Sequence, residues 1–410
     1  MVFKIIAIIL LSLYFLFNLF LSILQYKYRD RPVPEELNDI YDFETYQKWK
    51  QYSAEKIKVG LISSVVSFVI ILTILISDVL AIITKDITNE YTSAIIVLAI
   101  YIGINTITNC IFNYINDIKI EGKYGFNKMT MKTFIADQIK SLLIVAALFI
   151  GLTCLFIALY NGMGDYILIL FTGILFVFVL FIGFLYPFFS KLFNKFTPLE
   201  DGELKTSLIN LLESHNYHVK DIKVMDASRR TTKLNAYFTG FGKTKTIVLY
   251  DNLLKTMSNE QIISVFAHEM GHGLHKDTLK NNITSLLGIS IYVVFAWLLA
   301  RFPSIYCDFG FITINYGFAF LLLVNVALPF VATLLGFLTN YLSRKAEYRA
   351  DEQAVIEGYS EHLISALKVL SKENFSNLNP HPLIVLLSYS HPTLLQRIRH
   401  IRDFDGKRNK

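Results

Sequence analysis

The chain has 410 residues, of which 53% are hydrophobic and 18% charged, and its formal net charge is +6. So large an apolar share excludes a wholly soluble enzyme, and the positive charge needs no nucleic-acid partner because cations also suit a cytosolic membrane surface. The three cysteines provide neither a disulfide framework nor a thiolate cage for zinc.

Hydrophobic runs near the length needed to cross a bilayer appear at about seven places. They lie near residues 3–24, 59–83, 93–115, 141–160, 166–189, 281–300 and 311–341. The last run is long enough to be strongly tilted, broken at Pro329, or extended beyond the lipid. The first run is longer than a signal-peptide core and lacks a small-x-small cleavage pattern, so we interpret it as a retained anchor. The sequence therefore predicts a mainly α-helical, multi-pass membrane protein.

Lys and Arg are concentrated in alternate loops, because 36 of the 39 lie in segments 25–58, 116–140, 187–280 and 342–410. The other three are Lys4, Lys85 and Arg301, and all three belong to the opposite set of loops. By the positive-inside rule, the N-terminus faces away from the cytosol. The loop 187–280 and the C-terminal tail face the cytosol.

Three asparagines recur at i, i+4 spacing on one face of the third span: Asn105, Asn109 and Asn113. Polar side chains at that depth usually face a helix interface or water. The ordinary interpretation is interhelical hydrogen bonding. The alternative is a water-filled intramembrane cavity that admits a peptide.

A small α+β unit at 191–280 lies between five spans in 1–190 and two spans in 281–341. It begins with a polar, turn-rich exit from the membrane at 193–203. We predict helices near 202–215, 251–257 and 259–276, strands at 222–225, 235–239 and 246–250, and a hairpin turn at 240–243. A helical tail occupies 342–410.

The most informative motif is His-Glu-Met-Gly-His at 268–272, which lies within the helix predicted at 259–276. A capping box at 258–261 marks the beginning of that helix. On a helix, His268 and His272 lie on the same face and can share one metal ion. Glu269 lies beside them, placed to take a proton from a water at the metal. The pattern is typical of zinc proteases. The alternative is a membrane-surface helix with two solvated histidines.

Two histidines need a third protein ligand, and the best candidates follow the last span. Glu347 and Asp351 are an i, i+4 pair, so one carboxylate can bind the metal while the other accepts the ring N–H of a ligand histidine. We assign Glu347 to the metal and Asp351 to the histidine, although spacing alone allows the exchange. The alternative is a solvated helix with intrahelical pairs to Lys345 and Arg349.

Peptide hydrolysis also needs a donor for the oxyanion and a surface that holds the substrate. His391 or Arg397 could supply the donor, and spacing does not choose between them or exclude an ordinary polar tail helix. Asn235-Ala236-Tyr237 begins a strand just before the motif helix. An edge strand commonly pairs with an extended substrate, and Asn235 could add a side-chain hydrogen bond. The plainer interpretation is an asparagine that starts a turn.

Taken together, these motifs resemble the type I CAAX prenyl proteases, integral-membrane zinc endopeptidases of the gluzincin group. The resemblance covers nearly the whole chain and is specific in order and spacing. The matching segments are 31–34, 42–44, 121–128, 193–203, 235–237, 268–272, 347–351 and 390–392.

The resemblance implies seven spanning helices around a large water-filled chamber, with the zinc site facing inward near the cytosolic side. It implies one zinc ion bound by His268, His272 and Glu347, with Glu269 as general base. Eukaryotic members of the family cleave the last three residues from prenylated CAAX proteins and also cut at a second, upstream site. The resemblance further supports roles near the ligands or the substrate for Asp351, Asn235, His391 and Arg397.

Three features differ from the usual family pattern. Gly273 follows the second zinc histidine where the family often has an aromatic residue, the tail is short, and we find no ER-retrieval signal. These features resemble bacterial members. We therefore favour a bacterial plasma membrane, or an ER membrane if the protein is eukaryotic, and we expect a peptide or lipidated protein as substrate.

Three other functions compete with this hypothesis. A quality-control protease of the heat-shock type shares the zinc motif, but such proteins are typically shorter and have fewer spans. A transporter or channel would carry the motif as a vestige, so its activity would survive Glu269→Ala. A structural scaffold would bind no stoichiometric zinc. A protease, by contrast, would lose peptide cleavage on Glu269→Ala and keep its zinc.

Overall fold

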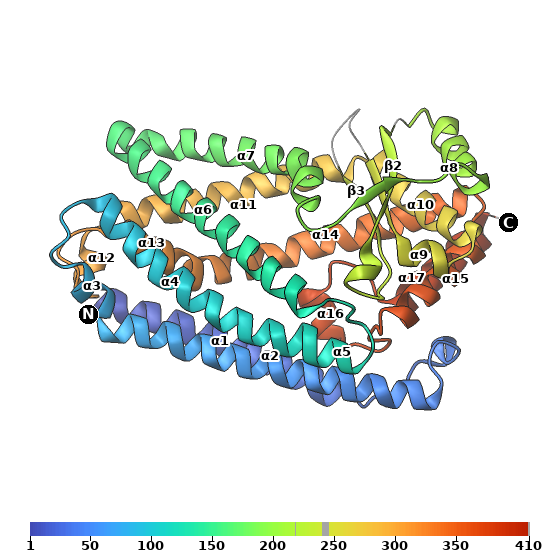
Figure 1. Ribbon diagram of the computed structural model, residues 1–410, viewed down its shortest axis with the longest axis horizontal. Coiled ribbons are helices and arrows are strands. Elements are labelled where there is room, and N and C mark those ends of the chain that lie inside the picture. The colour runs from blue at the N-terminus through green and yellow to red at the C-terminus, as the bar shows by residue number, and fades with distance from the viewer. Residues whose placement is uncertain (218, 240–245, 409–410) are drawn as a thin grey trace.

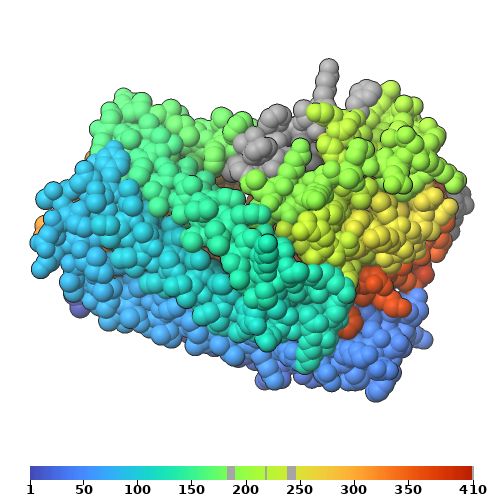
Figure 2. Space-filling view, viewed as in Figure 1, coloured from blue at the N-terminus to red at the C-terminus, as the bar shows by residue number. Residues whose placement is uncertain are grey.

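The computed structural model describes the chain except residues 218, 240–245 and 409–410, and in addition leaves out the side chains of 182–189, 238 and 239. Long helices run side by side along the longest axis of the molecule, and a smaller mixed unit lies at one end of them (Figure 1). In the space-filling view, α4 and α6 form a broad wall beside this unit (Figure 2). The molecule is thus mainly helical, as predicted.

The long helices correspond to the apolar runs of the sequence. They are α1 (Val2–Tyr28), α2 (Phe43–Ser77), α4 (Glu90–Asn113), α6 (Met131–Met163), α7 (Ile167–Ser190), α11 (Asp277–Arg301) and α14 (Leu328–Ile356). Among the described residues, six helical stretches are long and apolar enough to cross a membrane, and one of these, Met131–Phe181, contains α6 and much of α7. Their apolar windows are 11% to 33% buried within the protein. So much exposed apolar surface indicates contact with lipid.

Short polar caps begin several of these helices. Asp42, Asn89 and Thr130 each accept a hydrogen bond from the backbone N–H three residues later. A left-handed residue, Asp78, separates α2 from the short α3 (Val79–Thr84), and the Lys4 amine lies 2.6 Å from its carboxylate. The second predicted run is therefore two helices joined by a charged corner.

The last predicted run could be tilted, broken at Pro329 or extended beyond the lipid, and in the structure the helix is unbroken at Pro329. The helix runs on from α13 (Tyr316–Leu322) through a π-helical stretch (Leu323–Ala327) into α14, with Pro329 in the first turn of α14. Proline is tolerated there because its missing N–H removes few hydrogen bonds. The chain from Tyr316 to Ile356 thus leads directly from the membrane part to the mixed unit.

A four-stranded sheet forms the mixed unit, with β1 (Phe196–Pro198), β2 (Asp221–Met225), β4 (Thr246–Tyr250) and β3 (Ala236–Thr239) in that spatial order. β2 and β4 are parallel, and the other pairs are antiparallel. The three predicted strands are confirmed, whereas β1 lies in the segment interpreted as a turn-rich exit. The predicted hairpin turn at 240–243 lies outside the described residues. As an edge strand, β3 has one side available for pairing.

Helices from both ends of the chain complete this unit. α8 (Glu203–Ser214), α9 (Asp251–Thr256) and α10 (Asn259–Leu274) match the predicted helices, and the tail forms α15 (Ser360–Glu373), α16 (Pro382–Ser388) and α17 (Leu394–Arg408). Two further short helices lie elsewhere in the chain, α5 (Glu121–Lys123) after α4 and α12 (Ser304–Cys307) after α11. One hydrophobic core unites residues as distant as Leu37, Phe266 and Ile401. The tail is therefore part of the mixed unit.

The segment after α4 attaches the membrane helices to this unit. The Glu121 carboxylate accepts hydrogen bonds from Tyr52 at 2.7 Å, from Lys56 at 2.9 Å and from Lys233 at 3.1 Å. The backbone N–H of Lys128 donates to the carbonyl oxygen of Arg230 at 2.9 Å. These contacts hold the chain just before β3 against the membrane helices.

Candidate metal centre

Helix α10 carries the His-Glu motif and begins with the predicted capping box, in which the side chains of Ser258 and Gln261 each bond to the other's backbone N–H. The helix packs closely on α14 because Gly271 has no side chain. A Cβ atom at Gly271 would lie 2.9 Å from the Ala350 Cα atom. Glycine, a poor helix former, therefore sets the distance between the two helices that carry the candidate ligands.

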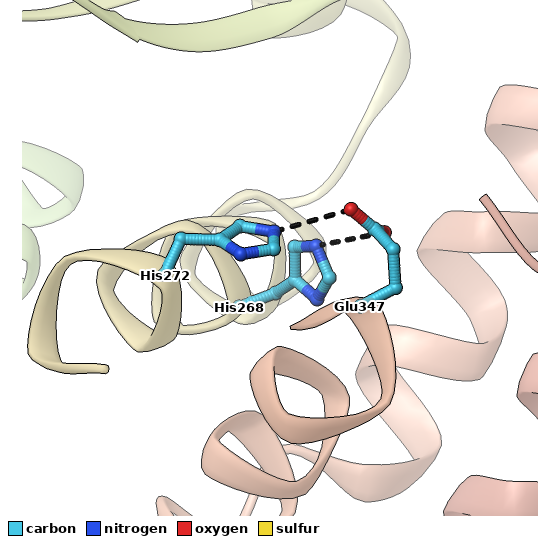
Figure 3. Close-up of side chains that lie close together, drawn as sticks. All are labelled: His268, His272 and Glu347. Atoms are coloured by element: carbon cyan, nitrogen blue, oxygen red, sulfur yellow. Dashed lines mark ion pairs between the residues drawn. The ribbon is translucent and has the colours of Figure 1, made fainter. Parts of the chain in front are cut away.

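The three predicted ligands converge. The Nε2 atom of His268 lies 3.6 Å from one carboxylate oxygen of Glu347, and the Nε2 atom of His272 lies 3.3 Å from the other (Figure 3). One donor atom from each residue lies within 4.8 Å of the other two. Glu347 is 5% exposed, although the sequence of its helix also fitted a solvated amphipathic helix. The solvated-helix interpretation of Glu347 is therefore wrong.

The chemistry of this cluster fits a divalent metal ion. Two imidazole nitrogens and one carboxylate oxygen are the protein ligands of a catalytic zinc site that keeps a position open for water or substrate. The Oε2 atom of Glu347 is buried and accepts no hydrogen bond from any residue that the structure describes. A buried, unsatisfied carboxylate oxygen is costly, and a cation would satisfy it.

The second nitrogen of His268 contacts the other predicted carboxylate. Asp351, which is fully buried, lies 2.9 Å from the Nδ1 atom of His268. Arg397 binds Asp351 with two nitrogens, at 2.6 and 2.9 Å, and its third nitrogen lies 3.5 Å from Glu347. An Arg397 nitrogen also lies 3.2 Å from the same Nδ1. The Asp351 carboxylate suits a proton on Nδ1, which would leave the Nε2 lone pair for a metal ion.

Sequence reasoning missed one residue of this cluster. The carboxylate of Asp277 lies 3.1 Å from the Nδ1 atom of His272 and is 7% exposed. Asp277 is the first residue of α11, a helix that the sequence shows mainly as an apolar run. The only available signal was its spacing, five residues after His272. That spacing is uninformative until the turn between the helices is known.

The electrostatics of the cluster favour positive charge. Burial alone would lower the pKa of His272, but its hydrogen bonds to Glu347 and Asp277 and the charges of Glu347 and Glu269 together outweigh burial and raise this pKa to about 9. Burial raises the pKa of the Glu269 carboxyl above its ordinary value, and nearby His268 and His272 oppose that rise. The carboxylates around His272 therefore favour positive charge at this cluster.

His391 reaches the cluster from the segment before α17. Its Nε2 atom lies 3.3 Å from Glu347, and its side chain is 62% exposed. It lines a cavity of about 630 Å³ together with Arg397 and Asn235. The predicted tail residues and the predicted strand residue are thus brought to one hollow beside the metal ligands.

The chain just before the edge strand is held by a side chain. Asn374 donates to the carbonyl oxygen of Leu234 at 3.0 Å and accepts from its N–H at 2.8 Å, much as a neighbouring strand would. Asn235, the next residue, is exposed and lines the cavity. Ala236 and Tyr237 pair with β4, and the Tyr237 hydroxyl lies near the Met225 sulfur. The ring of Tyr237 therefore lies over the sheet.

The row of asparagines in α4 also lines a cavity. Asn105, Asn109 and Asn113 surround a space of about 350 Å³ with Gln138 and Ser141 of α6. Asn105 donates to the carbonyl oxygen of Tyr101 in its own helix. The observation favours the cavity interpretation over interhelical bonding for this residue.

Comparisons with known proteins agree with this arrangement. Residues 22–195 match the model described as "CAAX prenyl protease N-terminal, five membrane helices", and residues 198–405 match "Peptidase family M48". The chain is 31% identical to a CAAX prenyl protease 1 homologue from Oryza sativa, over 97% of this chain and 96% of that protein. It is 30% identical to CAAX prenyl protease 1 of Saccharomyces cerevisiae, over 97% and 94%. The crystal structure of S. mikatae Ste24p superposes with a TM-score of 0.90 at 30% identity, over 97% and 99%.

Proposed function

The chain belongs to peptidase family M48 as a membrane metalloprotease of the CAAX prenyl protease type, and we propose that zinc is its metal. The observation that carries this proposal is the convergence of His268, His272 and Glu347, whose ligand atoms lie within 4.8 Å of one another, with one buried oxygen of Glu347 unsatisfied by the described residues. Zinc suits two imidazoles and a carboxylate better than magnesium or calcium, which prefer oxygen ligands. One zinc ion would be held per chain.

The reaction we propose is hydrolysis of a peptide bond near the C-terminus of a CAAX-type or lipidated substrate. When bound, zinc would act as a Lewis acid that lowers the pKa of water and polarises the substrate carbonyl. Glu269 removes the proton from the attacking water and then delivers it to the departing amine nitrogen. Its position beside both histidines on α10 supports this role.

His391 is our preferred donor to the oxyanion that develops on the substrate carbonyl. It is exposed and lies 3.3 Å from Glu347, so a carbonyl at the ligands would be within its reach. Arg397 is buried and already engaged by Asp351. We therefore propose that Arg397 holds Asp351, and through it His268, while adding positive charge near the scissile bond.

We propose that substrate pairs with the free edge of β3 and passes into the adjacent cavity. Asn235 is exposed at the start of this edge, and its side-chain oxygen accepts from the backbone N–H of Ala236, so its amide nitrogen could donate to a paired peptide. The cavity beside it contains hydroxyl and amide side chains, such as Ser371 and Asn377, and no carboxylate. Among the residues that the structure describes, this lining favours a neutral or anionic peptide segment over a basic one.

For the orientation in the membrane, we propose that the N-terminus lies outside and that the catalytic unit and C-terminus are cytosolic. The support is the distribution of Lys and Arg among the loops. The bacterial plasma membrane favoured from the sequence stays a prediction, and the ER membrane is the alternative. A quality-control protease of the heat-shock type is less well supported, because the match includes the five-helix N-terminal region and nearly the whole chain.

The decisive experiment measures cleavage of a CAAX peptide, with and without a farnesyl group, by the purified full-length protein in nanodiscs. We expect the wild type to cleave the farnesylated peptide and Glu269→Ala to be inactive with a full complement of zinc. The matched control is Glu260→Ala, an exposed glutamate on the same helix, which should cleave normally.

Different outcomes separate the parts of the proposal. Equal cleavage of both peptides would count against a dedicated role in prenyl-protein processing, but not against hydrolysis. Normal cleavage by Glu269→Ala would remove this glutamate from the mechanism. A preparation that is active without stoichiometric zinc, and insensitive to chelators, would refute the metal assignment.

A further inference from the structure

Each of the two metal-binding histidines has a carboxylate on its far nitrogen, but the two carboxylates come from different parts of the fold. Asp351, on the Nδ1 side of His268, lies one turn after Glu347 on α14. Asp277, on the Nδ1 side of His272, is the first residue of the membrane helix α11. The second carboxylate lies outside the metal-binding motifs, and the proposed mechanism gives it no role.

A sharp corner between two helices places Asp277. α10 ends at Leu274, and Lys276 adopts a left-handed conformation with φ 56° before α11 begins at Asp277. This conformation is unusual for lysine, and it turns the chain so that the first side chain of α11 faces back to His272. A negative charge in the first turn of a helix is also favoured by the helix dipole.

The charge of Asp277 is balanced in the same way as that of Asp351. Arg349 of α14 donates to Asp277 at 2.8 Å, as Arg397 of α17 donates to Asp351 at 2.6 Å. The Lys280 amine lies 3.2 Å from the same oxygen of Asp277, but its side chain is 57% exposed. A buried carboxylate without a cationic partner would be costly, so the arginine keeps Asp277 charged and in place.

We propose that Asp277 is a positioning residue for the metal centre: it holds the proton of His272 on Nδ1, so that the Nε2 lone pair faces the metal. This role depends on the proposed metal site at His268, His272 and Glu347. Because Asp277 begins α11 and contacts Arg349 of α14, it also connects two membrane helices to a metal ligand. Metal retention is thereby coupled to the packing of α11 on the catalytic unit.

Loss of such a supporting carboxylate typically lowers metal affinity by about 10- to 100-fold. We expect Asp277→Ala to release zinc to a chromogenic chelator faster than the wild type by a factor in this range. Asp277→Asn, whose amide oxygen can still accept from Nδ1, should release zinc at a rate between those of the wild type and Asp277→Ala. Asp277→Glu keeps the charge and should restore part of the retention.

The experiment uses full-length protein in nanodiscs and has three measurements. The first is the rate of zinc release to the chelator. The second is the visible spectrum of the Co²⁺-substituted protein, whose bands shift when a histidine ligand is displaced. The third is the melting temperature, which should fall less from wild type to Asp277→Asn in the zinc-free protein than in the zinc-loaded protein if the residue acts through the metal as well as through Arg349.

Two controls make the outcome specific. Lys280→Ala removes the exposed ion pair of Asp277 but leaves its contacts with His272 and Arg349, so it should retain zinc normally. Glu347→Ala tests the metal site itself: zinc retention equal to that of the wild type would refute that site. If Glu347→Ala loses zinc, but Asp277→Ala and Asp277→Asn release it at the wild-type rate with an unchanged Co²⁺ spectrum, only the role of Asp277 is refuted.

One further result would also refute the positioning role. If the melting temperature of zinc-free Asp277→Asn falls as far as that of its zinc-loaded form, the carboxylate acts as an anchor for α11 alone. A smaller fall in the zinc-free melting temperature than in the zinc-loaded one, combined with faster zinc release and partial rescue by Asp277→Glu, would establish the role.

Discussion

The two halves of helix α14 lie in opposite surroundings. In its first half, large apolar side chains face outward, and Leu334 is 69% exposed and Leu338 48% exposed. In its second half, charged side chains are buried, with Glu347 5% exposed and Asp351 fully buried. One helix therefore serves two environments: its membrane half is stabilised by lipid contact, and its catalytic half by ion pairs and close packing.

The difference extends to the packing of the catalytic unit and of the membrane helices. Around the catalytic half, α10 lies so close that Gly271 has no room for a side chain. Asp351 pairs there with His268 and Arg397, and Asp277 pairs with His272. Around the membrane part, α4 and α6 leave a polar cavity of about 350 Å³. We expect substitutions in the catalytic half to be severe and substitutions in the cavity wall to be mild.

Loss of the third ligand should have the largest effect. Glu347→Ala leaves only two imidazoles, which are too few ligands for a stable zinc site. We expect zinc to be absent by metal analysis and peptide cleavage to fall below detection. Glu352→Ala is the matched control, because this carboxylate on the same helix contacts His400 instead of the metal ligands. Undiminished zinc in Glu347→Ala would overturn the assignment.

The contact between α10 and α14 gives the next largest effect. Gly271→Ala introduces a Cβ atom 2.9 Å from the Ala350 Cα atom, so the helices must separate. Such overpacking costs about 1–3 kcal/mol, and it should also impair cleavage because ligands on both helices move apart. Thermal unfolding and cleavage assays measure the two effects.

Gly151→Ala provides the comparison in the membrane half. This glycine lies on α6, and a Cβ atom there would meet nothing within 4 Å. Alanine should be neutral or slightly stabilising, because glycine in a helix is less favourable by about 1 kcal/mol. Equal destabilisation by both substitutions would contradict the contrast between tight and loose packing.

The attachment of the two regions to each other should be of intermediate importance. Glu121→Gln removes a charge, 12% exposed, that two lysines and a tyrosine contact, and it leaves those lysines without their partner. We expect a loss of about 1–3 kcal/mol in the free energy of unfolding. Glu55→Gln disrupts a more exposed pair with Lys123 and should cost less than about 1 kcal/mol. A similar loss in both variants would argue against Glu121 as the main attachment.

The asparagine row should give the smallest effect. Asn109→Leu makes the cavity wall apolar while leaving the metal ligands untouched. Zinc content should stay at one per chain, and cleavage of long peptides should fall a few-fold while that of short peptides is unchanged. Ile107→Leu, at a residue 66% exposed on the same helix, is the control and should behave as wild type. A fall for short peptides as well would place the effect outside the cavity.

Some of this arrangement follows from local pattern. The His-Glu motif has helical spacing and a capping box, so α10 and the shared face of His268 and His272 were predictable. The same holds for Glu347 and Asp351, because i, i+4 spacing guarantees a common face on any helix. The apolar runs predicted the membrane helices, since in lipid only helices and closed barrels satisfy the backbone hydrogen bonds, and continuous runs of this length suit helices.

Other parts were beyond local pattern. β1 is a three-residue strand whose existence depends on its partner β2, and its own sequence reads as a turn. Gly271 is explained only by the closeness of α14. The different functions of His391 and Arg397 depend on which of them contacts Asp351, and their spacing in the tail contains no information about that contact.

The sequence by itself determined which side chains are the main candidates for metal binding and catalysis, because hydropathy, helical periodicity and motif spacing are properties of short segments. The tertiary structure alone decided how those segments meet: that α14 lies against α10 at the glycine, and that the first residue of a membrane helix turns back to His272. The physical reason is that packing and charge pairing between distant segments depend on their positions in space, and a left-handed residue such as Lys276 sets those positions without any periodic signal.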